Sequence, residues 1–318
     1  MAFLEVNNLH VWFPIRKGIL NRVVGYVRAV DGVSLTLEEG ETLGLVGESG
    51  CGKTTLGRAI LGLEKVRSGQ VFFDGAEFTA LPEAKRRLLR KRCQMIFQDP
   101  FASLNPRMTV LELVTEGLKY HGLLGDESLY DAGLRLLNDV GLGSDALYRY
   151  PHEFSGGQRQ RISIARALSL KPSLIICDEP VSALDVSVQA QVINLLMDLR
   201  DKYHLSYIFI SHDLSVVKII SQKIAVMYLG HIVETGPASQ VMEQPLHPYT
   251  QALLSAVPVP GKTTDNRIIL KGEMPSPANP PTGCPFHPRC PRACPDCAKR
   301  LPEIRPVSKE HSVACDRI

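Results

Sequence analysis

The sequence predicts an α/β protein in which helices cover a mainly parallel β-sheet. Short, apolar, β-branched segments of the kind that form buried strands occur at residues 42–46, 174–177, 207–210 and 224–229. Helical spacing of Leu and Val alternates with them, above all between about residues 82 and 168. Alternation of strands and helices is typical of a layered α/β domain. Further strand patterns are found at residues 4–13, 33–37 and 71–74, and a helical stretch at residues 53–63.

Length and composition fit one large core with a smaller appended unit. The chain has 318 residues, of which 44% are apolar and 22% charged, with a formal net charge of +3. No stretch approaches the roughly 18 consecutive apolar residues of a membrane-spanning helix. The first residues, MAFLE, place an acid where a secretory signal has a basic start and an apolar run. We therefore expect that, if the protein acts at a membrane, it does so from the cytoplasmic side and through partner proteins.

Composition changes towards the C-terminus. A boundary is indicated near Gln244-Pro245, and prolines are dense from Pro258 onward. We therefore predict a main domain at residues 1–250, with a helical subdomain at about 82–168, and an extension at residues 251–318. The extension has too few periodic apolar residues for a sizeable core of its own, and its cysteines are expected to staple it.

A phosphate-binding motif lies between a predicted strand and a predicted helix. Residues 47–54 read G-E-S-G-C-G-K-T, which matches the P-loop pattern G-x-x-x-x-G-K-[ST]. Its glycines let backbone N–H groups curl around phosphate oxygens, and the helix N-terminus adds partial positive charge. Lys53 is expected to reach the β- and γ-phosphates, and Thr54 to bind Mg²⁺. The predicted ATP-binding residues here are Gly47, Glu48, Ser49, Gly50, Cys51, Gly52, Lys53, Thr54 and Thr55. The alternative is a glycine-rich turn without a ligand.

Two acids end the predicted strand at residues 174–177. Asp178 and Glu179 follow it directly, and a carboxylate at the C-terminal end of such a strand lies beside the neighbouring P-loop. We expect Asp178 to coordinate Mg²⁺ and Glu179 to polarise the attacking water as general base. A solvated turn after a strand is the alternative.

A third motif predicts a second anion site. Ser155 and Gln158 fit the S-x-x-Q capping box, so a helix is expected to begin there and run to Leu168. Its N-terminus favours an anion, but the chain has one P-loop, so the phosphate must come from elsewhere. A capped surface helix without a ligand is the alternative.

The residues 154–158, F-S-G-G-Q, resemble the signature motif of ABC-type ATPases, with Phe154 in place of the usual Leu. The resemblance implies a P-loop NTPase core with an antiparallel β subdomain. It also implies that two subunits pair head-to-tail, each signature helix capping the γ-phosphate held by the other. The signature residues predicted to bind ATP are Ser155, Gly156, Gly157 and Gln158.

Other motifs match the same superfamily in order. Gln98 resembles the Q-loop glutamine, which implies a role at ATP and Mg²⁺, and His212 resembles the switch histidine, which implies a catalytic contact with the γ-phosphate. Phe13 aligns with the aromatic residue that stacks on adenine, although Trp12 and Tyr26 are nearby and core packing is an alternative for each. The D-loop, which crosses the dimer interface, is matched by Ser182, Ala183, Leu184 and Asp185.

Three later features resemble the importer branch that handles di- and oligopeptides. They are the segment FQDPFASLNPRMTV at residues 97–110, the segment HPYT at residues 247–250, and the cysteine-bearing tail. The resemblance implies that the chain powers peptide import from the cytoplasmic face of the inner membrane, as a peripheral subunit. Implied partners are a second ATPase subunit, often a different chain, two membrane-spanning permease subunits and an extracellular or periplasmic substrate-binding protein.

Other functions stay open at this stage. The same motor could serve another cargo, such as a nickel chelate or glutathione. A soluble ABC ATPase of translation or DNA repair is a rival, although such proteins usually carry two cassettes or a long coiled-coil insertion. The basic run at residues 85–92 carries six cations and is expected to be a solvated helix face, with anionic lipid or a membrane subunit as alternatives. No nucleic-acid partner is expected.

Five of the eight cysteines crowd the last 35 residues. Without an export signal, this favours a metal or cluster site over disulfides. In the resembled family, four tail cysteines are associated with an iron–sulfur cluster, and they correspond to Cys284, Cys290, Cys297 and Cys315. The resemblance thus implies a structural [4Fe–4S] cluster. Zn²⁺ is the main alternative, because Cys294 and Cys297 form a C-x-x-C pair, and free thiols are another.

Overall fold

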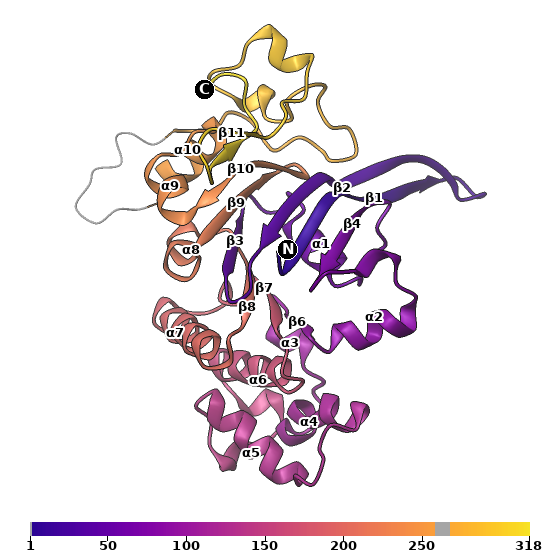
Figure 1. The fold of residues 1–318 in the computed structure, drawn as a ribbon, viewed down its shortest axis with the longest axis vertical. Coiled ribbons are helices and arrows are strands. Elements are labelled where there is room, and N and C mark those ends of the chain that lie inside the picture. Colours follow the sequence, from indigo (N-terminus) through magenta and orange to yellow (C-terminus); the bar gives the residue numbers. More distant parts are fainter. Residues whose placement is uncertain (1, 258–267) are drawn as a thin grey trace. The chain divides into compact units, whose positions relative to one another are not determined.

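The fold is that of a computed structural model, which describes residues 2–257 and 268–318 (Figure 1). Its contacts divide the chain into two compact units. One comprises Met1–Leu81 with Ser211–Ile318, and the other comprises Pro82–Ile210. Residues 258–267, where the proline-rich tail was predicted to begin, lie outside the described residues. The predicted boundary between residues 250 and 251 stays a prediction.

The first unit contains an antiparallel sheet with the strand order β2-β1-β4-β5. The strands β1 (Leu4–Lys17) and β2 (Arg22–Leu37) pair along almost their whole length, from Leu4 opposite Leu37 to Lys17 opposite Arg22. Only their outer ends, residues 4–13 and 33–37, were predicted from the sequence. None of residues 12–29 is buried, so the apolar alternation that identifies a half-buried strand is absent there. The sheet is completed by β4 (Ser68–Phe73) and β5 (Ala76–Glu77).

A second set of strands in this unit positions the P-loop. The buried strand β3 (Thr42–Val46) runs parallel to β9 (Lys223–Tyr228), and β9 pairs antiparallel with β10 (His231–Pro237). Beyond β10 lie two short strands of the predicted extension, β12 (Ser312–Val313) and β11 (Arg305–Pro306). The extension therefore joins this sheet. The helices of the unit are α1 (Lys53–Ile60), α8 (Leu214–Ile220), α9 (Ala238–Glu243) and α10 (Pro248–Ser255).

A buried carboxylate on β10 binds two segments of the C-terminal part of the chain, which here means the residues after β10 (238–318). Glu234 is fully buried, and its two oxygens accept hydrogen bonds from the backbone N–H groups of Leu246 at 2.8 Å and His247 at 2.9 Å. The Nε2 atom of His311 lies 2.8 Å from the same carboxylate. Because a buried carboxylate is costly without partners, these contacts hold the residues around 247 and 311 in place.

The second unit contains three parallel strands and a group of helices. The strands β6 (Cys93–Ile96), β7 (Leu174–Asp178) and β8 (Ser206–Ser211) pair in that order. The helices are α2 (Glu83–Arg90), α3 (Pro100–Ser103), α4 (Val110–His121), α5 (Leu129–Asp139), α6 (Gly156–Leu168) and α7 (Val186–Tyr203). Helices α4 and α5 pack against α6, and α6 packs against α7 (Figure 1).

Two sequence predictions concern this unit. The stretch from 82 to 168 is mostly helical as predicted, but the sequence analysis missed β6, whose four residues are too few to interrupt a helical pattern. The basic run lies mostly on α2, which buries none of its residues. This exposure fits a solvated face and fits a surface for anionic lipid or a membrane subunit equally. Among the residues that the structure describes, no helix is both long enough and apolar enough to cross a membrane.

Candidate functional site

The P-loop occupies the turn between β3 and α1, as predicted, and two of its glycines are enforced by close packing. A Cβ atom on Gly47 would lie 2.1 Å from the carbonyl oxygen of Met227, and one on Gly52 would lie 2.0 Å from that of Ala29. Gly52 also has a φ of +109°, which side-chain-bearing residues rarely adopt. The glycines therefore let the loop lie directly on neighbouring backbone.

Lys53, the first residue of α1, is held inside this loop. Its side chain is almost fully buried, and its Nζ donates hydrogen bonds to the carbonyl oxygens of Gly47 at 2.8 Å and Glu48 at 2.9 Å. The Sγ atom of Cys51 lies 3.7 Å from the same ammonium group, and burial raises the pKa of the Cys51 thiol. The loop thus concentrates positive charge at the N-terminus of α1, where Thr54 and Thr55 form the first turn.

The two predicted acids lie at the C-terminal end of β7. Asp178 is buried as the last residue of the strand, and Glu179 follows with a φ of +46°. The backbone N–H of Glu179 donates to the carbonyl oxygen of Ile210 at 3.0 Å. The Nε2 atom of Gln98 donates to the Oε2 atom of Glu179 at 3.0 Å. The structure therefore joins Gln98 to the predicted general base, a pairing that the sequence analysis did not anticipate.

The predicted capping box at the start of α6 is confirmed. Ser155 Oγ accepts the N–H of Gln158 at 3.4 Å, and Gln158 Oε1 accepts the N–H of Ser155 at 3.0 Å. A Cβ atom on Gly157 would lie 2.4 Å from Cγ1 of Val188 on α7. At this end of α6, the glycine is therefore required by helix packing.

The segment 182–185 follows the acidic strand end and precedes α7. The hydroxyl of Ser182 donates to the carbonyl oxygen of Glu179 at 3.1 Å. A Cβ atom on Gly156 would lie 3.3 Å from Cδ2 of Leu184. Within the second unit, the predicted D-loop thus bonds to the backbone of the predicted base, and Leu184 leaves little room for a larger residue at Gly156. Ala183 and Asp185 complete the turn into α7.

His212 lies directly after β8, where the resemblance placed it. The next residue, Asp213, caps α8 by accepting the N–H of Ser215 at 2.8 Å. The hydroxyl of Ser211 accepts the N–H of Asp213 at 3.0 Å. His212 is therefore presented on an ordered strand-to-helix turn.

The aromatic residues considered for adenine stacking have different surroundings. The indole of Trp12 packs against the guanidinium groups of Arg28 and Arg67, at 4.7 and 4.2 Å from the ring centre. Phe13 and Tyr26 each expose 37% of their surface. Tyr26 shares this local packing, because its ring lies 4.8 Å from the Arg67 guanidinium and 5.9 Å from the Trp12 ring. No such ring contact involves Phe13 among the described residues.

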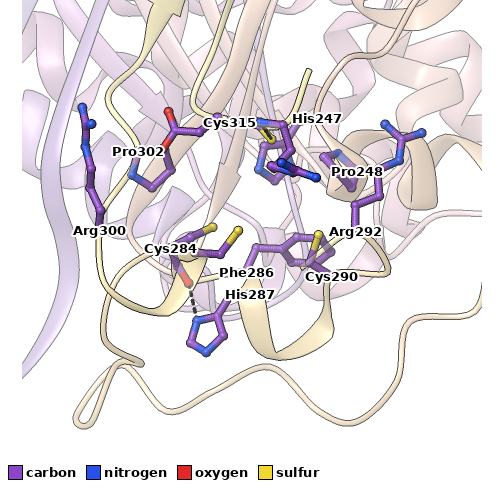
Figure 2. Close-up of a pocket in the computed structure, with 13 residues that line it drawn as sticks. His247, Pro248, Cys284, Phe286, His287, Cys290, Arg292, Arg300, Pro302 and Cys315 are labelled. Carbon is purple, nitrogen blue, oxygen red and sulfur yellow. Dashed lines mark hydrogen bonds between the residues drawn. The ribbon is translucent and has the colours of Figure 1, made fainter. Parts of the chain in front are cut away.

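Four of the five tail cysteines line one pocket of the first unit. The four are Cys284, Cys290, Cys297 and Cys315. Figure 2 shows Cys284, Cys290 and Cys315 around this pocket, together with His247 and Phe286. Cys294 is absent from the described residues that line it, and its Sγ contacts that of Cys297 at 3.5 Å. The cysteines that line this pocket are therefore the same four that the family resemblance implied as cluster ligands.

The described side chains are not arranged as the ligands of one metal ion. Among residues 2–257 and 268–318, no group of three or more His, Cys, Asp or Glu side chains could hold a metal. A tetrahedral zinc site with Zn–S bonds of about 2.3 Å would bring its sulfur atoms to about 3.8 Å from one another. The 3.5 Å between the sulfur atoms of Cys294 and Cys297 is close to that spacing, but no third ligand joins this pair among the described residues. The structure therefore supports neither a zinc site nor an iron–sulfur cluster directly. Burial raises the pKa of the Cys284 thiol to about 11, so the metal-free thiol is protonated at neutral pH.

Sequence reasoning missed two residues that contact the P-loop. Tyr249 and Arg289 both bond to Glu48, from positions 201 and 241 residues away along the chain. Both lie inside segments that matched the peptide-importer branch, but no spacing rule connects them with the P-loop. Only the tertiary fold brings them there.

Comparison with known proteins assigns the class. Residues 30–182 match the model of the ABC transporter family. A solved structure of MJ0796, described as a bacterial ABC transporter cassette in dimeric form, has 26% sequence identity to this chain. The match covers 74% of this chain and 98% of the MJ0796 chain, with a TM-score of 0.65. The cbiO1 protein of Clostridium perfringens, part of an ABC transporter complex, is 25% identical over 76% of this chain and 91% of its own, with a TM-score of 0.66. The chain is an ABC-type ATPase.

Its branch follows from the C-terminal part and from close relatives. Residues 233–297 match the family described as "Oligopeptide/dipeptide transporter, C-terminal region". The oligopeptide transport ATP-binding protein AppF of Bacillus subtilis is 54% identical, over 99% of this chain and 97% of its own length. OppF of Escherichia coli is 53% identical, over 100% of this chain and 96% of its own length. The chain belongs to the oligopeptide/dipeptide transporter family of ABC ATPases.

Proposed function

We propose that this chain is the ATP-hydrolysing subunit of an importer for di- and oligopeptides. The observation that carries the proposal is the similarity to oligopeptide transport ATP-binding proteins at 54% and 53% identity along essentially the whole chain. The P-loop, the acidic pair Asp178 and Glu179, and His212 are all present, which supports an active motor. A nickel chelate or glutathione as cargo, or an ATPase without a membrane partner, would be the alternatives.

The proposed chemistry is hydrolysis of the β–γ phosphoanhydride. Lys53 and the P-loop N–H groups bind the triphosphate, with Phe13 against the adenine. A water attacks the γ-phosphorus, the bond to the β–γ bridging oxygen breaks, ADP leaves, and the carboxylate of Glu179 takes the proton of the water. The hydrogen bond from Gln98 orients that carboxylate. Mg²⁺ neutralises charge on the β- and γ-oxygens when it is bound, and Thr54, Gln98 and Asp178 would hold it.

A second ATPase subunit completes the site in this proposal. The N-terminus of α6 carries partial positive charge, and the helix itself supplies no partner for the backbone N–H groups of its first residues, Gly156 and Gly157. Both features suit a γ-phosphate. The ATP is therefore clasped between the P-loop of one subunit and the signature helix of the other, with the segment 182–185 at the interface. Closure of this dimer would move two membrane-spanning permease subunits on the cytoplasmic side of the inner membrane, which receive peptide from a substrate-binding protein.

Peptide uptake by cells tests the cargo. Deletion of the gene should abolish uptake of labelled tri- to pentapeptides, and re-expression of the chain should restore it while the Glu179→Gln variant should not. Affinity isolation from membranes should recover permease subunits and show whether the second ATPase subunit is a different chain. Unchanged peptide uptake after deletion, with no membrane protein recovered, would contradict the proposal.

For the extension we propose a [4Fe–4S] cluster with a structural role. The proposal is supported by the family resemblance and by the four cysteines that line one pocket, because a [4Fe–4S] cluster binds one cysteine thiolate at each of its four irons. Cys284, Cys290, Cys297 and Cys315 would hold it. Such a cluster would join the segments around residues 284–297 to the C-terminal residues near 315.

Metal analysis of the anaerobically purified chain tests this assignment. Iron and acid-labile sulfide in equal amounts are expected, with loss of both after Cys→Ser substitution at any of the four pocket cysteines. Cys294→Ser is the matched control and should retain the cluster, because Cys294 does not line the pocket. Zinc in place of iron, or equal loss from Cys294→Ser, would exclude the assignment.

A further inference from the structure

Glu48, the second residue of the P-loop, is bound by two side chains from the C-terminal part of the chain. Its backbone N–H donates to the hydroxyl oxygen of Tyr249 at 2.8 Å. Its carboxylate accepts from Nη1 of Arg289, with distances of 3.1 and 3.0 Å to the two oxygens. The side chain of Arg289 is only 9% exposed and that of Glu48 29%. This ion pair is therefore partly shielded from water, where charge pairs are stronger than at the surface.

The same segment of the P-loop anchors the phosphate-binding lysine. The Nζ atom of Lys53 bonds to the carbonyl oxygens of Gly47 and Glu48. A third residue of the C-terminal part, Met274, has its terminal carbon 3.6 Å from where a Cβ atom on Gly50 would lie. Met274 thus leaves room for little more than a methyl group at Gly50. At Glu48, the C-terminal part holds the peptide unit to which Lys53 is bonded.

Tyr249 and Arg289 are themselves held firmly. Tyr249 is fully buried, and its ring lies 4.7 Å from that of Tyr228 and 5.4 Å from that of Phe286. Phe286 is 1% exposed, and its carbonyl oxygen accepts the N–H of Arg289 at 3.0 Å. Phe286 also lines the cysteine pocket, and Arg289 directly precedes Cys290. A short, packed segment therefore runs from the cysteine pocket to the P-loop.

We propose that Arg289 and Tyr249 are positioning residues for the P-loop, supplied by the C-terminal part of the chain. Glu48 places a carboxylate in a loop that must accept a triphosphate, and like charges repel. Arg289 neutralises this carboxylate and holds it against the C-terminal part, while Tyr249 fixes the Glu48 peptide unit. The inference rests on the proposed function, in which ATP binds at the P-loop.

Calorimetric titration of the full-length chain with MgATP tests the inference. Arg289→Ala should weaken ATP binding roughly 10- to 100-fold, because the loop is displaced and the Glu48 charge is unmasked. Arg289→Lys, which keeps a positive charge, should recover part of the affinity. Adding Glu48→Gln to Arg289→Ala should recover most of it, because the repelling charge is then gone. Lys299→Ala, which removes an exposed cation from the extension, is the control and should bind as the wild type does.

The outcomes separate this inference from the proposed function. Wild-type chain that fails to bind MgATP, or Lys53→Ala that binds it equally well, would overturn the proposed function. If Arg289→Ala binds MgATP as tightly as the wild type while Lys53→Ala does not bind MgATP, only the positioning role would be overturned. A loss of affinity that Glu48→Gln does not relieve would overturn it as well, since a purely structural arginine predicts no such rescue. If Arg289→Ala does not fold, as judged by its thermal unfolding midpoint, Tyr249→Phe removes one hydroxyl only and should still weaken binding several-fold.

Discussion

The Glu179→Gln variant is expected to bind MgATP as tightly as the wild type and to lose hydrolysis by roughly 10²- to 10⁴-fold. Glutamine has the shape of glutamate, and its amide oxygen can accept the hydrogen bond that Gln98 donates at 3.0 Å. The strand end and its hydrogen bond to Ile210 therefore stay intact. What is lost is the carboxylate that takes the proton of the attacking water.

Steady-state phosphate release and equilibrium ATP binding, measured on the same preparations, check this expectation. Glu116→Gln, which neutralises an exposed glutamate on α4, serves as the matched control and should hydrolyse ATP normally. Turnover by Glu179→Gln at the rate of this control would refute the assignment of the base.

The second large effect is expected from Ser155→Asp at the start of α6. Aspartate caps a helix as well as serine does and suits the positive end of the helix dipole, so the thermal stability should be kept. Its charge would face the γ-phosphate of the paired subunit. Two unit charges about 4 Å apart at an effective dielectric constant near 20 repel by about 4 kcal/mol, so hydrolysis should fall on the order of 10³-fold. ATP binding to the isolated chain should be unaffected.

Ser155→Ala separates this effect from helix capping. Alanine removes the cap at a cost of about 1 kcal/mol of stability but introduces no charge. If α6 were a capped helix without a ligand, Ser155→Ala would be the more harmful of the two, and Ser155→Asp would hydrolyse ATP like the wild type. ATPase assays and thermal unfolding of both variants, in the assembled transporter, therefore decide between the two interpretations.

Local rules account for the parts of the fold and the site that the sequence predicted. The cap of α6 involves residues three apart, Ser155 and Gln158, and the P-loop pattern spans eight consecutive residues. Such features depend on residues that are close together along the chain, so a single sequence is enough to predict them. The buried strands β3, β7, β8 and β9 were found for the same reason, because each is a short apolar run.

Features that depend on distant contacts were missed. The ribbon formed by residues 14–29 has no buried residue, so pairing between β1 and β2 stabilises it and no apolar alternation marks it in the sequence. Gln98 and Glu179 are 81 residues apart, and Glu48 and Arg289 are 241 apart. No periodicity or spacing links such pairs. The sequence analysis took the four cysteines of the pocket from the family resemblance. That Cys294 does not line the pocket could be seen only in the folded structure.

The most direct test of the account is an electron cryomicroscopy structure of the assembled transporter with MgATP and the Glu179→Gln variant. We predict that the ATP held by the P-loop of one ATPase subunit contacts Ser155 and the N–H of Gly156 from the other subunit at its γ-phosphate. A fully loaded complex in which both residues are remote from every nucleotide would contradict the proposed mechanism.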